Sequence, residues 1–176
     1  MLSLGSCGGA LISPRIVLSA YHCIYKGDKR AVILGHDTID YTILLKEGGI
    51  NNYYSIPIME IKHSKPLNQK DDVGILILES PAKFSGKIQP ICLPEQDQDF
   101  SDVTAVTAGW GLIAKKTRAP ELRKLDLKVD DKKYWSMKYE NMLGTKVVKN
   151  KDGEYQDPCA GDSGAPELIL KIESSD

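Results

Sequence analysis

The fold of this chain is decided by Asp157-Pro158-Cys159-Ala160-Gly161-Asp162-Ser163-Gly164-Ala165-Pro166, which lies near its end. A serine between glycines can sit on a tight, exposed turn, because glycine tolerates backbone conformations that other residues avoid. Two nearby amides, those of Gly161 and Ser163, can then point at one oxyanion. A serine hydroxyl is a weak nucleophile, so Ser163 needs a base that a third group holds in place. The stretch therefore predicts a nucleophile loop.

Both partners that such a serine needs stand upstream of it. A histidine beside a cysteine occurs in Leu18-Ser19-Ala20-Tyr21-His22-Cys23, and a carboxylate, Asp72, stands at the start of the apolar run Val73–Leu78. Along the chain the order is His22, Asp72 and Ser163, with separations of 50 and then 91 residues. This order separates the chain from the two other orders in which Ser-His-Asp triads occur.

Five blocks of sequence carry a wider resemblance. They are Cys7-Gly8-Gly9-Ala10-Leu11-Ile12 through His22-Cys23, the run after Asp72, Pro90-Ile91-Cys92-Leu93-Pro94, Ala108-Gly109-Trp110-Gly111 and the Ser163 loop. In this order they resemble the chymotrypsin/trypsin family of serine proteases, from about Cys7 to Pro166. The resemblance implies an all-β fold of two antiparallel six-stranded Greek-key barrels, with the triad in the cleft between them. Residues 1–95 would form the N-terminal barrel and residues 96–176 part of the C-terminal barrel, together making one peptidase domain.

The resemblance also implies a role for each site residue. His22 is expected to act as general base toward Ser163 and then as general acid toward the leaving amine, while Asp72 orients His22. Because the family places the acid directly before the apolar strand, Asp72 is preferred to its neighbour Asp71. The amides of Gly161 and Ser163 would form the oxyanion hole. Asp157 stands where tryptic members carry the acid of the primary pocket, which favours a substrate Arg or Lys. No metal or organic cofactor is expected.

Three departures from the family pattern imply a chain shortened at both ends. The activation sequence and the first strand, which would precede Cys7, are expected to be missing, so Asp162 lacks the N-terminal amine that its counterpart meets in active members. The chain stops ten residues after Pro166, before the pocket walls and the terminal helix of the family. Ala165 stands where a glycine is usual. Both barrels are therefore expected to be incomplete, with exposed strand edges that lower stability.

Three functional interpretations follow from these features. The first is a trypsin-like serine endopeptidase that hydrolyses peptide bonds through an acyl-enzyme. The second is a catalytically inactive protease homologue that acts as a binding or regulatory module, which the missing activation terminus and pocket walls favour. The third is a truncated gene product whose full-length form is the enzyme. Hydrolysis of an arginyl ester by the purified chain would exclude the second.

The four cysteines bear on the compartment in which the protein works. By resemblance, Cys7 and Cys23 form a disulfide that closes the loop carrying His22, whereas Cys92 and Cys159 have no family partner left in the chain. Disulfide use indicates an oxidising compartment, so we expect secretion, although no signal peptide is expected within the printed residues. The expected partners are a protein or peptide substrate and protein protease inhibitors, and the chain is expected to be a monomer.

Composition argues against other partners. The chain has 176 residues, 41% of them hydrophobic, and a net charge of −1, so its overall charge does not indicate binding to nucleic acid or to an anionic membrane. No apolar run approaches the 18 residues that a transmembrane helix needs. Residues 115–151 hold 12 Lys/Arg against 5 Asp/Glu. Such a run usually forms a solvated face, and a patch that binds a polyanion such as heparin is the less favoured interpretation.

Short apolar runs between Gly and Pro residues predict many strands, and with a single helical pattern they indicate an all-β protein. The predicted strands are two runs within residues 7–24 and the ranges 31–35, 41–45, 53–61, 73–78, 103–108, 122–129 and 168–172. The range 73–78 is continuously apolar, which predicts a strand buried on both sides. Asp130 or Asp131 is expected to cap a short helix over 132–142.

Overall fold

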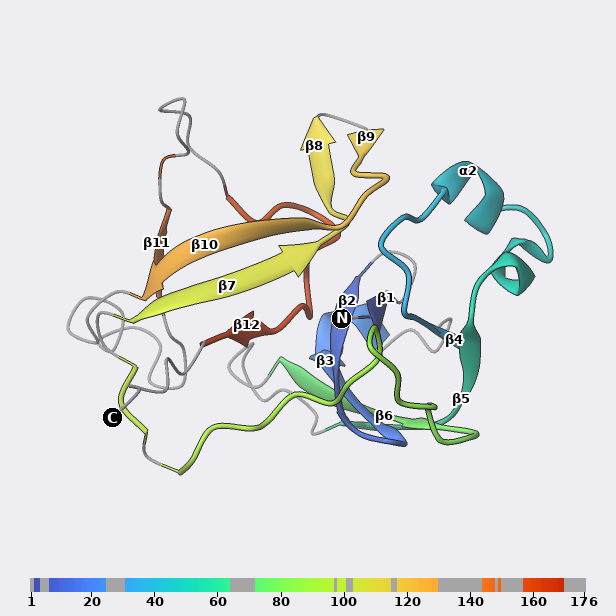
Figure 1. Cartoon of the computed structure of the whole chain (residues 1–176), viewed down its shortest axis with the longest axis horizontal. Coiled ribbons are helices and arrows are strands. Elements are labelled where there is room, and N and C mark those ends of the chain that lie inside the picture. Colours follow the sequence, from blue (N-terminus) through green and yellow to red (C-terminus); the bar gives the residue numbers. More distant parts are fainter. Residues whose placement is uncertain are drawn as a thin grey trace.

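The computed structural model describes residues 2–3, 7–24, 31–63, 72–96, 98–100, 103–114, 117–129, 144–147, 149 and 157–169. Within them the chain is mostly strand, which confirms the all-β prediction (Figure 1). The elements in order are β1 (Leu2–Ser3), β2 (Gly8–Ser13), β3 (Ile16–Ala20), α1 (Tyr21–Ile24), β4 (Ala31–Leu34), α2 (Tyr41–Leu44), the 3-10 helix η1 (Gly49–Asn52), β5 (Ser55–His63), β6 (Val73–Leu78), β7 (Thr104–Gly109), β8 (Leu112–Ala114), β9 (Thr117–Arg118), β10 (Arg123–Val129), β11 (Thr145–Val147) and β12 (Glu167–Leu168).

The first half of the chain forms a closed antiparallel barrel in the order β1-β2-β3-β6-β5-β4. The sequence predicted an incomplete barrel, but β1 closes it by pairing with β2 on one side and β4 on the other. Apolar residues of the strands fill the barrel interior, where Val17, Val32, Leu76 and Leu78 are fully buried. Because the sheet closes on itself, each of its six strands pairs with a neighbour on both sides, and no strand has an unpaired edge.

Strand β6 differs from its prediction. Its residues alternate between the barrel interior and the outside, so Leu76 and Leu78 are fully buried while Val73 is 57% exposed. A strand in a barrel faces the core on one side only, and no second layer covers the outside of β6 at Val73. The expectation of burial on both sides was therefore wrong at this end of the strand.

The second half of the chain forms a four-stranded antiparallel sheet in the order β11-β10-β7-β12. Strand β10 presents Leu127 and Val129 to the core, and both are almost fully buried, whereas Lys124 and Lys128 face solvent. This half is incomplete as a barrel among the described residues, as predicted. The boundary between residues 95 and 96 stays a prediction.

A loop of the first barrel is hydrogen-bonded to the second half. The carbonyl of Asp37 accepts hydrogen bonds from the indole Nε1 of Trp110 at 3.2 Å and from the Leu122 amide at 2.7 Å. The amide of Ile39 donates to the carbonyl of Pro120 at 2.8 Å, and the Ile39 side chain is fully buried. These bonds fix the two halves against each other near the start of β10.

The segment after Ile39 also departs from its prediction, because Tyr41–Leu44 forms the helix α2 and not a strand. The carboxylate of Asp40 accepts hydrogen bonds from the amides of Thr42 and Ile43, at 2.8 and 3.3 Å, and so caps the helix. The Thr42 hydroxyl also donates to it at 2.6 Å, and the bonds from Thr42 lower the pKa of Asp40. This cap outweighs the strand preference of the residues that follow.

The remaining secondary-structure predictions fall into two groups. Strands were found, with small shifts, at every other predicted range, although the last one is described only for Glu167–Leu168. The predicted helix over 132–142 lies outside the described residues.

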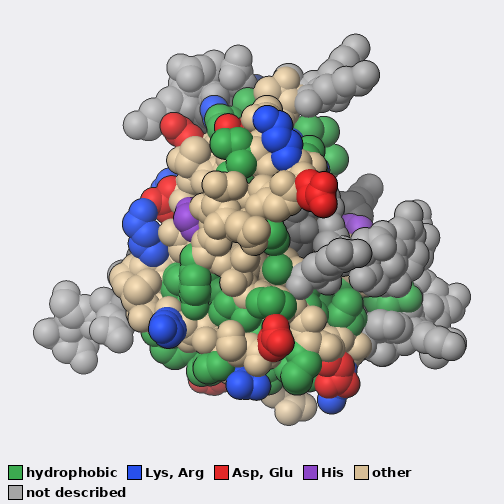
Figure 2. Space-filling view, turned by 90° about the vertical axis from the view of Figure 1, so that its right-hand side faces the viewer, with side chains coloured by type: hydrophobic (Ala, Val, Ile, Leu, Met, Phe, Trp, Pro, Cys, Tyr) green, Lys and Arg blue, Asp and Glu red, His purple; other side chains and the backbone are tan. Residues whose placement is uncertain are grey.

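On the face shown in Figure 2, acidic and basic side chains are interspersed. In the basic run, Arg123, Lys124, Lys128, Lys146 and Lys149 are exposed, as a solvated face requires, whereas Arg118 is half-buried. None of the described helices is long and apolar enough to span a bilayer.

Candidate active site

The barrel register brings His22 and Asp72 together. Strands β3 and β6 are antiparallel neighbours, and Ala20 at the end of β3 lies opposite Val73 at the start of β6. The amide of Tyr21 continues this ladder by donating to the carbonyl of Asp72 at 3.1 Å. The chain then turns into α1, which places His22 beside Asp72 although 50 residues separate them in sequence.

The Asp72 carboxylate binds His22 through both of its oxygens. Oδ1 accepts from the backbone N–H of His22 at 2.8 Å, and Oδ2 lies 2.6 Å from the ring Nδ1. An ionised carboxylate can only accept, so this contact requires the proton on Nδ1 and leaves Nε2 with its lone pair. The side chains are 53% and 36% exposed, respectively, so the pair lies at the surface. The arrangement holds a histidine in one orientation with a basic nitrogen turned away from the carboxylate.

The loop that carries Ser163 packs against the same barrel. The Gly8 amide of β2 donates to the carbonyl of Ser163 at 2.8 Å, and Gly8 also lies against Ala165. Gly164 has a φ of 80°, and a Cβ there would overlap the hydroxyl of Ser19. That hydroxyl is buried and donates to the Gly8 carbonyl at 2.9 Å. A glycine is therefore required on each side of this contact, which positions the loop over β2 and β3.

The predicted disulfide between Cys7 and Cys23 is confirmed. It joins the residue before β2 to the residue after His22, and the Cys23 sulfur lies 3.7 Å from the Ser163 carbonyl oxygen. His22 lies close to both sulfurs, but their bond leaves no thiolate to bind a metal. Cys92 and Cys159, for which the sequence left no family partner, are free and exposed. The bridge thus ties His22 to the start of β2, and its Cys23 sulfur contacts the loop that carries Ser163.

His22 and Ser163 are brought onto the same side of the barrel without being joined directly. The hydrogen bonds of the described residues include none between the His22 ring and the Ser163 hydroxyl. Such bonds are often long or poorly aligned in a free enzyme and shorten when substrate is bound.

The backbone amides of Gly161 and Ser163 are both without a hydrogen-bond acceptor among the described groups. The neighbouring amides of Asp162 and Ala165, by contrast, each have one. Gly161 has a φ of 104°, a conformation that a residue with a Cβ rarely adopts. The loop therefore leaves two donors beside Ser163 without acceptors, as a site for an oxyanion requires.

Asp162 is directed away from Ser163, into the second half of the molecule. Its Oδ1 accepts from the Gly111 amide at 2.8 Å and its Oδ2 from the Cys159 amide at 3.0 Å. The carboxylate occupies the space where Gly109 and Gly111 lack side chains, since a Cβ on either residue would overlap it. The Gly109-Trp110-Gly111 block was identified in the sequence only as a family motif. Its Gly-x-Gly spacing is the signal that could have suggested a buried group between the glycines.

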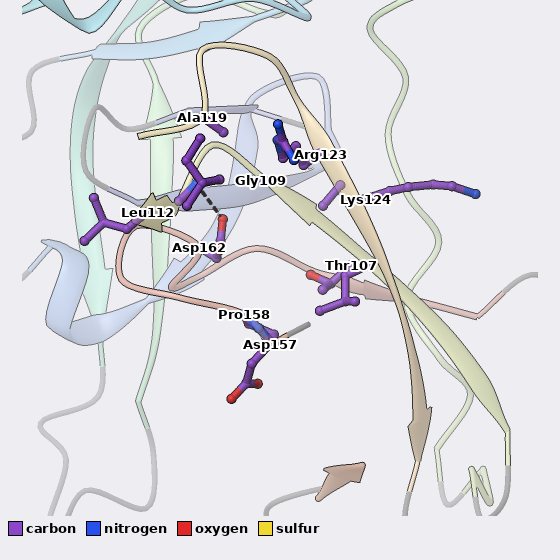
Figure 3. Close-up of a pocket in the computed structure, with 13 residues that line it drawn as sticks. Thr107, Gly109, Leu112, Ala119, Arg123, Lys124, Asp157, Pro158 and Asp162 are labelled. Carbon is purple, nitrogen blue, oxygen red and sulfur yellow. Dashed lines mark hydrogen bonds between the residues drawn. The ribbon is translucent and has the colours of Figure 1, made fainter. Parts of the chain in front are cut away.

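Asp157 and Asp162 both line a cavity of about 430 Å³. Its other walls come from β7, β8 and β10 and from Ala119, which lies between β9 and β10. They include the apolar Leu112 and Leu125 and the basic Arg123 and Lys124. Figure 3 shows the two carboxylates pointing in opposite directions, that of Asp162 toward the Gly109–Gly111 turn and that of Asp157 away from it. Asp157 is exposed. The cavity is thus lined by acidic, basic and apolar residues.

Comparison with known proteins decides the family, because the Trypsin family model matches residues 1–171. The chain belongs to the trypsin family. This trypsin-family chain is 30% identical over 169 residues to granzyme M of Homo sapiens, a match that covers 91% of the chain and 62% of granzyme M. It is 25% identical over 181 residues to the clotting factor G beta subunit of Tachypleus tridentatus, covering 91% of the chain and 56% of that protein. The chain therefore spans less than two thirds of the length of these relatives.

The likeness extends to solved structures. The structure of human heparin binding protein superimposes with a TM-score of 0.76 at 22% identity, covering 96% of this trypsin-family chain and 73% of the other. At this identity the likeness supports the fold, which agrees with the barrel and the second sheet described above. The family is thus established by the sequence match, and the fold by both comparisons.

Proposed function

We propose that this trypsin-family chain is a serine endopeptidase that hydrolyses peptide bonds through an acyl-enzyme. The observation that carries the proposal is the pairing of His22 with Asp72, in which one carboxylate oxygen holds the ring Nδ1 at 2.6 Å and the other holds the backbone of the same residue at 2.8 Å. A carboxylate that only paired with a surface histidine would not need to fix both its ring and its main chain.

The chemistry follows from this geometry. The Ser163 hydroxyl attacks the substrate carbonyl while His22 takes its proton at Nε2, and Asp72 stabilises the imidazolium that forms. The negative charge on the carbonyl oxygen is received by the amides of Gly161 and Ser163, which lack other acceptors among the described groups. His22 then protonates the leaving amine, and water releases the acyl group from Ser163 by the same steps in reverse.

Asp157 is the proposed determinant of primary specificity, for cleavage after Arg or Lys. It lies six residues before Ser163, it is exposed, and its carboxylate is turned away from the backbone bonds that hold Asp162 (Figure 3). A carboxylate on the nucleophile loop pairs with a guanidinium or ammonium group through charge-assisted hydrogen bonds. The proposed partners are therefore protein or peptide substrates with basic residues, together with protein inhibitors that bind the site as such substrates do.

The proposed working environment is extracellular, with the chain acting as a monomer. The Cys7–Cys23 bridge ties the histidine to the barrel, and such structural disulfides persist mainly in oxidising compartments. Under reducing conditions the base and the nucleophile loop would lose this connection, so the proposed activity depends on the compartment.

The test is hydrolysis of a peptide mixture by the purified, oxidised chain, with the cleavage sites read by mass spectrometry. We expect cleavage after Arg and Lys, and Asp157→Asn should reduce that preference while Asp99→Asn, an acid outside the site, should not. Cleavage without a basic preference would refute the role of Asp157. A folded chain that cleaves no peptide would refute the proposal and favour the inactive binding homologue.

A further inference from the structure

Arg118 lies where the two halves of the molecule meet the nucleophile loop. It is the last residue of β9, pairs with Leu112 of β8 and is half-buried. Its guanidinium carbon lies 4.9 Å from the centre of the Tyr41 ring of α2, a cation–π distance. On its other side is Gly161, where an added Cβ would come within 2.5 Å of the Arg118 Nη1. The guanidinium is thus held against the residue whose amide is proposed to bind the oxyanion.

The Nη1 atom of Arg118 is buried and has no hydrogen-bond partner in the described part of the chain. The ion pairs found among these residues join His22 with Asp72, Lys62 with Glu60 and Lys87 with Asp37, so none of them neutralises Arg118. A buried charged donor without an acceptor is costly. The cost is explained if an acceptor arrives from outside, and the planar guanidinium matches a carboxylate best.

We propose that Arg118 is a specificity-determining residue that binds an acidic side chain of the peptide substrate beside the oxyanion hole. This inference rests on the proposed function, because it places the reacting carbonyl at Gly161. A peptide spans at most about 3.6 Å per residue, so a carboxylate that reaches Arg118 belongs to a residue close to the scissile bond. Asp157 and Arg118 together select a substrate with a basic residue at one position and an acidic residue at another.

A purely structural role for Arg118 has to be separated from this one. Its contact with Tyr41 joins α2 of the first barrel to β9 of the second half, so losing it can disturb the cleft for every substrate. Such a disturbance weakens the binding of acidic and neutral peptides alike. A carboxylate site changes only the ratio between them, so the ratio is the quantity to measure.

The experiment uses the Ser163→Ala chain, which cannot turn substrate over, and fluorescent peptides that contain one Arg. A single Asp is placed in turn at each of about three positions on either side of the Arg, and each peptide is compared with its Asn isostere by fluorescence anisotropy. At one position, or at two adjacent ones, we expect the Asp peptide to bind roughly tenfold more tightly, the size of a charged hydrogen bond at a half-exposed site.

Variants assign the effect to its residue. Adding Arg118→Gln should remove the Asp preference and Arg118→Lys should keep part of it. Arg15→Gln, which changes an exposed arginine in the turn between β2 and β3, should leave it unchanged. Equal binding of Asp and Asn peptides at every position, equal weakening of both by Arg118→Gln, or no peptide binding at all would overturn the inference. If the Asp preference is found but the wild-type chain hydrolyses no peptide, the proposed function fails and the carboxylate site stands.

Discussion

The most informative single change is Gly109→Ala, because it tests how Asp162 holds the nucleophile loop. Gly109 is the last residue of β7 and its φ is not positive, so alanine fits its backbone without strain. The new methyl group would overlap the Oδ1 of Asp162, which accepts from the Gly111 amide at 2.8 Å. The carboxylate can avoid it only by turning away from Gly111 and from the Cys159 amide, which it holds at 3.0 Å.

The size of the effect follows from these two bonds. Each hydrogen bond to a charged group contributes about 1.5 kcal/mol at the lower end, which suits a half-buried carboxylate, so both together contribute about 3 kcal/mol. Replacing glycine by alanine raises the free energy of unfolding by about 0.4–1 kcal/mol, because alanine restricts the unfolded chain. We therefore expect Gly109→Ala to lower the free energy of unfolding by about 2 kcal/mol. The labelling of Ser163 by a fluorophosphonate should also slow, since Asp162 precedes it directly.

Urea denaturation followed by tryptophan fluorescence measures the first effect. Gly86→Ala is the matched control, because a Cβ on Gly86 meets nothing within 4 Å and its φ is not positive; its stability should be unchanged or slightly raised. If Gly109→Ala is as stable as Gly86→Ala and is labelled at the wild-type rate, the Asp162 bonds do not hold the loop and this reasoning is refuted.

Three further perturbations test other parts of the account. Asp72→Asn should reduce peptide hydrolysis by roughly a thousandfold or more while near-UV circular dichroism stays unchanged, because a neutral amide no longer fixes the histidine tautomer; unchanged hydrolysis would exclude Asp72 as the orienting acid. Because bonds from Thr42 lower the pKa of Asp40, its cap on α2 is present at neutral pH and is lost as the pH falls through that lowered value. The protection factor of the Thr42 amide in hydrogen exchange should fall over that acid range and, for Asp40→Ala, should already be low at pH 7. An unchanged protection factor in the variant at pH 7 would contradict the cap. Ser19→Ala should cost about 1–2 kcal/mol in urea denaturation by removing a buried bond to the Gly8 carbonyl, and a loss below about 0.3 kcal/mol would show that this bond does not support the loop.

The sequence predicted most strands, and the family resemblance predicted the Cys7–Cys23 disulfide and the pairing of His22 with Asp72. The helix α2 and several contacts between distant residues were not predicted. The sequence predicted two strands within residues 7–24 and one at 73–78, and the family resemblance implied that His22 and Asp72 meet. The helix α2 was missed because Tyr-Thr-Ile-Leu has strand-forming residues, and the Asp40 cap that overrides them was not weighed. Its signal was in the sequence, since an aspartate directly before a run of this kind can start a helix.

Contacts between distant residues could not be predicted from local pattern. The carboxylate of Asp162 accepts from the Gly111 amide, 51 residues away in sequence. The side chain of Arg118, in β9, lies against Gly161 in the loop that carries Ser163. The sequence does not indicate either partner, because charged side chains are usually solvated. The closure of the first barrel by Leu2–Ser3 was missed because two residues are too few to show strand periodicity.

The central claim is that His22, Asp72 and Ser163 act as one catalytic unit in this chain. The most direct measurement is labelling of the oxidised, folded chain with a fluorophosphonate probe, with the modified residue located by mass spectrometry. The account predicts a single adduct on Ser163 that disappears in Ser163→Ala and is formed far more slowly in His22→Ala. No adduct in a chain whose near-UV circular dichroism shows ordered tertiary structure, or an adduct that forms equally fast in His22→Ala, would contradict it.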